Sequence, residues 1–210
     1  MAVEKNPNEE LKNIKQRISN MCYKAESILN MCVDGFIKQK VEVINEAKNL
    51  IVAVRNEENE LIKLLSDTAS RSDVDKGLIK TLIAIVSNIE MAIDGLDSVL
   101  QHVKTKAGEG ILFSDKAVNE ICHLFKETLG ILRNAGDVIT TKSDILRKHI
   151  IDKYMNLNEI VDAYSEEHEE RLIKGICQPR SSSLYLNIVD SMMKVVWHIK
   201  QAIDRYFSGG

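Results

Sequence analysis

The chain has 210 residues, of which 44% are hydrophobic and 28% are charged, and its formal net charge is −3. This composition excludes a disordered chain, and the length is enough to bury one sizeable core. Lysine and arginine are scattered among acidic residues, which excludes the basic stripe that nucleic-acid binding needs. No stretch approaches the roughly 18 consecutive apolar residues of a membrane span, so no transmembrane segment is predicted.

Apolar residues recur every three or four positions along the chain, and no alternating strand pattern interrupts them. This period predicts a helical protein, and the presence of only two prolines leaves room for long helices. We expect six helices with short polar breaks between them. In chain order they cover residues 7–38, 40–69, 74–106, 114–140, 143–175 and 183–207.

The segment AGEG at 107–110 is the clearest internal boundary, with three expected helices on each side. We predict a first three-helix repeat over residues 1–107 and a second over residues 111–210. Short connections favour antiparallel packing of neighbouring helices. The predicted fold class is therefore all-α, an elongated six-helix bundle made of two tandem repeats.

The third expected helix carries three carboxylates beside its apolar stripe, on Glu90, Asp94 and Asp97. Spacings of four and three residues place them on one helical face. Carboxylates this close repel one another, and a bound cation would relieve the repulsion. Oxygen ligands suit Mg, Ca, Mn, Fe or Zn. These three residues are the candidate metal site, although their spacing alone favours a solvated acidic edge.

The sixth expected helix has the same heptad register as the third, which aligns Met193 with Glu90 and Trp197 with Asp94. Only the first copy therefore keeps its acidic positions. His198 directly follows Trp197 and is expected to be a surface imidazole near an aromatic ring.

Other polar residues of the second half give weaker indications. His168 lies among glutamates, and we expect a wet, charged helix face with Arg171 as an internal partner; the alternative is a contribution to a metal site. Glu120 and His123 form the chain's only E-x-x-H, whereas a di-iron bundle needs two such pairs. No nucleotide-binding or nucleophile motif occurs, so the protein is not expected to be an enzyme.

The order of these features resembles the PhoU family, helical proteins associated with bacterial and archaeal phosphate uptake. It is also similar to the PhoU-type domain of sodium–phosphate cotransporters. The family carries an E-R-x-x-D-H-x-x-N-like signature on the third helix of each repeat. In the first copy Glu90 and Asp94 match its acids, whereas Met91, Gly95 and Ser98 replace its arginine, histidine and asparagine.

The second copy of the signature shows the opposite pattern. Lys194, His198 and Gln201 keep a basic residue, an imidazole and an amide, but Met193 and Trp197 replace both acids. The resemblance implies surface metal sites, often with iron or zinc, one in each repeat. Here a metal is expected only in the first repeat, because methionine and tryptophan supply no oxygen ligand.

The resemblance covers most of residues 7–207 and implies a cytoplasmic regulator of phosphate transport or phosphate signalling that acts by docking. Its implied partner is a phosphate transporter component or a sensor kinase, which would also bring it to the inner membrane face. The cofactor is Fe, Zn, Mn or Mg, or none. The polar, charged start of the chain is not a signal peptide pattern, and cysteines without a C-x-x-C pair indicate reduced thiols. The alternative is a metal-free helical adaptor or a structural homo-oligomer, a homodimer for example.

Overall fold

The computed structural model describes residues 7–72 and 74–208, and this part of the chain contains helices and no strand. The all-α fold class is thereby confirmed. The helices are α1 (Pro7–Lys38), α2 (Val41–Ala69), α3 (Lys76–Gly108), α4 (Asp115–Thr141), α5 (Asp144–Ile173) and α6 (Pro179–Ser208). Within the described residues, no helix combines the length and the hydropathy that crossing a membrane requires.

The helix ends lie close to the predicted positions, and the differences have local causes. α3 begins slightly later than expected because the side chain of Asp75 accepts hydrogen bonds from two amides of the first turn. Ser114 and Ser143 cap α4 and α5 in the same way. α6 begins at Pro179, four residues before its predicted start, because proline lacks the amide hydrogen that a first turn leaves unpaired.

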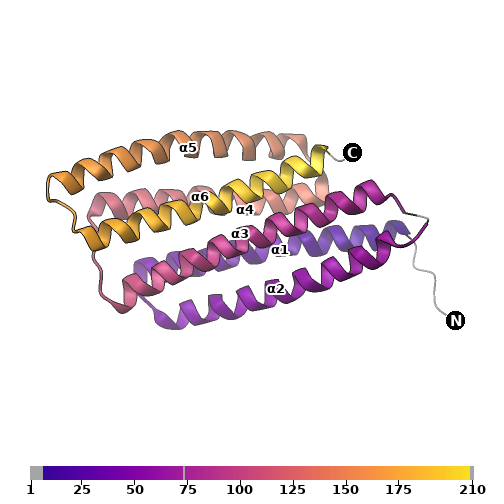
Figure 1. The fold of residues 1–210 in the computed structure, drawn as a ribbon, viewed down its shortest axis with the longest axis horizontal. Coiled ribbons are helices and arrows are strands. Elements are labelled where there is room, and N and C mark those ends of the chain that lie inside the picture. The colour runs from indigo at the N-terminus through magenta and orange to yellow at the C-terminus, as the bar shows by residue number, and fades with distance from the viewer. Residues whose placement is uncertain (1–6, 73, 209–210) are drawn as a thin grey trace.

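The six helices form an elongated bundle in which α3 and α6 lie side by side in front of α1 and α4 (Figure 1). Within the described chain, α2 packs only against α1 and α3, and α5 packs only against α4 and α6. The three helices of each half therefore pack on one another in the same pattern. The most extensive helix–helix contact joins α3 to α6, so the two halves share one core.

Gly95 brings the backbones of α3 and α6 close together. A Cβ atom at this position would lie 2.8 Å from Val195 Cγ2 and 3.3 Å from the carbonyl oxygen of Ser191. Both neighbours belong to α6, and the second is backbone that cannot rotate away. The contact between the two halves therefore depends on the missing side chain at Gly95.

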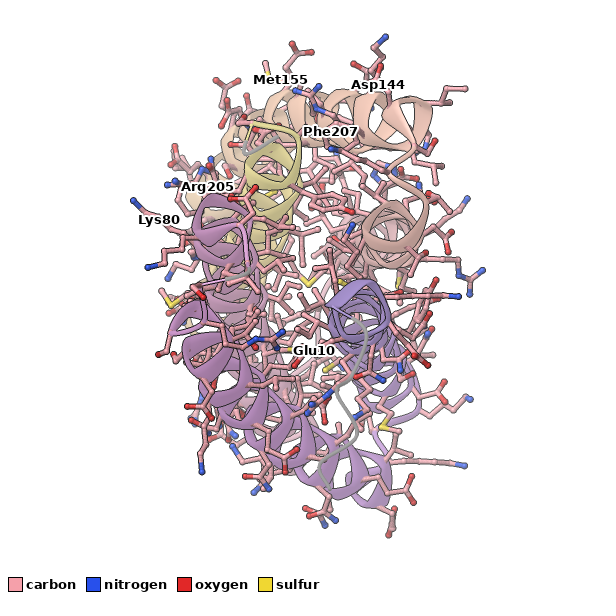
Figure 2. All side chains as sticks on the ribbon, turned by 90° about the vertical axis from the view of Figure 1, so that its right-hand side faces the viewer. Glu10, Lys80, Asp144, Met155, Arg205 and Phe207 are labelled. Carbon is pink, nitrogen blue, oxygen red and sulfur yellow. The ribbon has the colours of Figure 1, made fainter. Side chains whose placement is uncertain are left out.

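The two outer helices are held by different kinds of side chain. α2 buries apolar residues along its whole length, whereas α5 buries only two, Ile150 and Leu157. The two other buried residues of α5 are His168 and Arg171. The view along the bundle shows α5 as an outer layer, with Asp144 and Met155 on its outside (Figure 2). The apolar residues that α2 buries are Ile44, Ala47, Ile51, Val54, Leu61 and Leu65.

The four cysteines have free thiols. Cys22 and Cys32 lie in the hydrophobic core, and burial raises the pKa of each thiol to about 12. Thiols with so high a pKa remain protonated at neutral pH and behave as small apolar side chains.

Candidate functional site

The acidic face of α3 lies against two basic side chains of α2. Arg55 Nη2 is 2.7 Å from Asp94 Oδ1 and 3.1 Å from Asp97 Oδ2. Lys48 Nζ is 2.8 Å and 2.9 Å from the two carboxylate oxygens of Asp97. Burial raises the pKa of Asp97, but the hydrogen bonds from Lys48, Gln101 and Arg55 outweigh it and leave this pKa below its ordinary value. Two of the three predicted ligands are therefore partners of cations.

Glu90 is the third predicted ligand and has a different environment. It forms no hydrogen bond or ion pair within the described chain. Partial burial raises the pKa of its carboxyl group, and the nearby charges of Asp94 and Glu58 add to this increase, while Arg55 opposes it. Glu90 therefore shares the face with Asp94 but not its basic partners.

The arrangement of these side chains does not fit a bound metal ion. Among the described residues, no three His, Cys, Asp or Glu side chains are grouped as metal ligands. An ion such as Fe, Zn, Mn or Mg needs several ligand atoms that it can approach directly. Here the guanidinium of Arg55 and the ammonium of Lys48 already bind oxygens of Asp94 and Asp97. The metal site at Glu90, Asp94 and Asp97 stays a prediction from sequence.

The metal content of the purified protein distinguishes an acidic face neutralised by Lys48 and Arg55 from one that binds a metal ion. We expect the wild type, purified without chelator, to contain substoichiometric metal, because Lys48 and Arg55 neutralise the acidic face. Replacing both cations in a Lys48→Met, Arg55→Met variant is expected to increase divalent metal binding, measured by elemental mass spectrometry. The control is Glu90→Ala with Asp94→Ala. If the wild type contained stoichiometric metal and the control did not, a metal ion would have displaced Lys48 and Arg55 from the carboxylates.

The equivalent part of the second half is a surface groove between α5 and α6. Its volume is about 300 Å³, and an exposed indole lies at its edge, because Trp197 is 44% exposed. The position aligned with Asp94 thus carries an aromatic anchor in place of a carboxylate. The lining residues are Tyr154, Asn158, Asp190, Met193, Lys194 and Trp197.

His198 connects this groove to the acidic face of α3. Its ring is edge-on to Trp197 with 4.6 Å between centroids, and its Nδ1 is 3.4 Å from Oδ1 of Asn88 on α3. Burial lowers the pKa of His198, and the negative charge of Asp94 only partly opposes this effect. The expected surface imidazole is therefore half-buried between the two helices.

A buried polar cluster on α4, α5 and α6 differs from the sequence prediction. His168 is only 2% exposed, so its expected place on a wet helix face is wrong. Arg171 has the expected partner on its own helix, since its Nη1 lies 3.9 Å from Glu167 Oε2. It also donates to Glu120 on α4, from Nη1 to Oε1 at 3.0 Å and from Nη2 to Oε2 at 2.8 Å. The Tyr185 hydroxyl on α6 donates to Glu120 Oε2 at 2.7 Å. We call Glu120, His168, Arg171 and Tyr185 the clasp.

His168 completes the clasp through its ring. The imidazole stacks on Tyr185 with 4.3 Å between centroids and 15° between planes. Its Nδ1 lies 3.3 Å from Arg171 Nη2. His123, the other half of the E-x-x-H motif with Glu120, points to a different partner, because its Nδ1 is 2.9 Å from the hydroxyl of Tyr164. The motif therefore does not act as a pair of ligands.

Comparison with known proteins gives likenesses in structure alone. No protein-family model matches the chain, and no curated protein matches it. The crystal structure of PhoU from Pseudomonas aeruginosa superposes with a TM-score of 0.86 at 16% sequence identity, covering 97% of this chain and 98% of that one. The phosphate transport system regulatory protein PhoU from Streptococcus pneumoniae superposes with a TM-score of 0.84 at 14% identity, covering 96% and 95%. The chain thus has the PhoU fold over nearly its whole length.

Proposed function

We propose that this protein regulates phosphate transport or phosphate signalling by docking to another protein. The observation that carries the proposal is the superposition on two PhoU proteins over nearly all of each chain, one of them a phosphate transport system regulatory protein. The buried charged groups of the clasp bind one another, as side chains with a packing role do. A regulator without catalytic activity agrees with both facts.

The docking surface in this proposal is the face formed by α3 and α6. It carries a charged part, where Asp94 meets Arg55, and an apolar part, where Trp197 borders the groove. Exposed aromatic residues beside a groove are typical anchors of protein interfaces. The partner is a phosphate transporter component or a sensor kinase, met in the cytoplasm or at the inner membrane face.

A substitution at the groove tests the docking proposal. Trp197→Ala is expected to weaken partner binding roughly tenfold or more, because truncating an aromatic anchor costs about 2 kcal/mol. Binding is measured by quantitative co-purification from the native host and by titration of the partner recovered. The matched control is Ile145→Ala, which removes an 80% exposed apolar side chain far along α5 from the groove.

The rate of phosphate uptake is a second measurement that tests the docking proposal. Deleting the gene is expected to change the rate of labelled phosphate uptake, and the Trp197→Ala protein is expected to restore the normal rate incompletely. Unchanged uptake together with co-purification of no phosphate-transport or kinase component would refute the regulator. A native mass that shows only self-association would then favour the homo-oligomeric adaptor.

A further inference from the structure

The second half of α5, residues 158–173, is attached to the bundle almost without buried apolar side chains. Its only buried residues are His168 and Arg171. The matching part of α2, residues 58–69, buries Leu61 and Leu65 in the hydrophobic core. Apolar burial is the main source of helix attachment in a bundle. These corresponding segments of the two outer helices, which lie at opposite ends of the bundle (Figure 1), are therefore fixed by different forces.

The other contacts of this half of α5 are made by side chains that are only partly buried or are exposed. Tyr164 binds His123, and Glu167 forms an ion pair with Lys116 on α4. Val161 and the ring of Tyr164 pack against the core, but both are only partly buried. Water can replace such hydrogen bonds when the helix moves away, so they resist its release weakly.

The clasp is also incompletely satisfied. His168 Nε2 and Arg171 Nε are buried without a hydrogen-bond partner in the described chain, and so is the hydroxyl of Ser182 on α6. Because His168 Nδ1 faces a guanidinium donor, the neutral ring carries its hydrogen on Nε2, where no acceptor lies. Release of the helix would let each of these atoms form a hydrogen bond with water.

The charges around His168 make its protonation unfavourable while the clasp is closed. The groups facing it are Arg171 on its own helix, Glu120 on α4 and Tyr185 on α6, and Glu169 lies next to it in the chain. Burial lowers the pKa of His168 and the positive Arg171 lowers it further, while Glu120 and Glu169 oppose them. An imidazole exposed to water has its ordinary pKa of about 6.5.

We propose that residues 158–173 form a releasable arm, held closed by the clasp and released when His168 takes up a proton. Because protons bind the open arm more readily than the closed one, acidification below about pH 6.5 favours opening. Between pH 7.5 and 5.5 the opening equilibrium constant rises by at most about tenfold, the limit for a ring that stays neutral in the closed arm. Release uncovers the flanks of α4 and α6 that α5 covers, in the second half of the molecule only (Figures 1 and 2).

Hydrogen–deuterium exchange of the full chain at the two pH values tests the arm. After correction for intrinsic exchange rates, amides of 158–173 are expected to show lower protection than those of 58–69. Their opening constant is expected to increase at pH 5.5 by up to about tenfold, while that of 58–69 stays constant. Equal protection of the two segments at both pH values would overturn the proposal.

Two histidine variants test whether protonation of His168 causes the arm to open. His168→Phe keeps a ring on Tyr185 and removes the titrating group, so its arm is expected to stay closed at pH 5.5. His123→Gln changes the other histidine of the α4–α5 interface and is expected to keep the increase in opening at pH 5.5. An increase that persists in His168→Phe, or vanishes in His123→Gln, would overturn the role of His168. His168→Gln serves the same comparison where the phenylalanine variant fails to fold.

Discussion

Replacing Arg171 by methionine is expected to destabilise the attachment of α5 by about 3–5 kcal/mol. Glu120 is 4% exposed and would lose both hydrogen bonds from the guanidinium, keeping only the one from Tyr185. A buried carboxylate without its countercharge is strongly unfavourable. The loss is expected first in hydrogen exchange of 158–173, and then as an early phase in urea unfolding followed by circular dichroism.

The double variant Glu120→Gln, Arg171→Met separates the charge from the packing. Removing both charges leaves no buried ion, so most of the lost stability is expected to return. The segment 58–69 should keep its protection in both variants, because α2 does not contact the clasp. A loss below about 1 kcal/mol in Arg171→Met would mean that water reaches Glu120 readily and that the clasp does not hold α5.

Gly95→Leu is expected to cost about 3 kcal/mol or more, because the new side chain enters the close contact between α3 and α6. Its Cβ would lie 2.8 Å from Val195 Cγ2 and 3.3 Å from the Ser191 carbonyl oxygen, so α3 and α6 must separate. The gain in helix propensity over glycine, about 1 kcal/mol, is smaller than this cost. Urea unfolding measures the difference.

Gly130 on α4 provides the matched control for this substitution. A Cβ atom there would meet nothing within 4 Å, so Gly130→Ala should stabilise the protein by about 1 kcal/mol through helix propensity alone. The double variant Gly95→Ala, Val195→Ala shortens the side chain that the new Cβ atom would meet. It is therefore expected to lose less stability than Gly95→Leu. A Gly95→Leu protein as stable as the wild type would show that the α3–α6 contact adapts.

The helices could be predicted from sequence because the buried face of a helix is visible in the spacing of its apolar residues. In α3 the apolar residues repeat at heptad spacing, and Ser114 before α4 supplies a cap within three residues of the amide that it binds. Both signals are local. The PhoU fold was expected from the resemblance to that family, and the structural likenesses confirm it.

The ion pairs between helices could not be predicted, because each joins residues far apart in sequence. Arg171 and Glu120 are 51 positions apart, and Lys48 and Asp97 are 49 apart. A spacing rule applies along one helix and does not say which residue of another helix faces it. One signal for the clasp was present, since Glu120 occurs within the apolar stripe of α4, next to Ile121. A carboxylate in such a place needs a buried cation.

The positions of the chain ends have a consequence for the order of the halves. α1 begins and α6 ends at one end of the bundle, whereas α3 passes to α4 at the other end (Figure 1). Joining α6 to α1 and opening the chain between α3 and α4 would leave every helix beside its present neighbours. The topology therefore allows a circular permutation in which the second half is synthesised first.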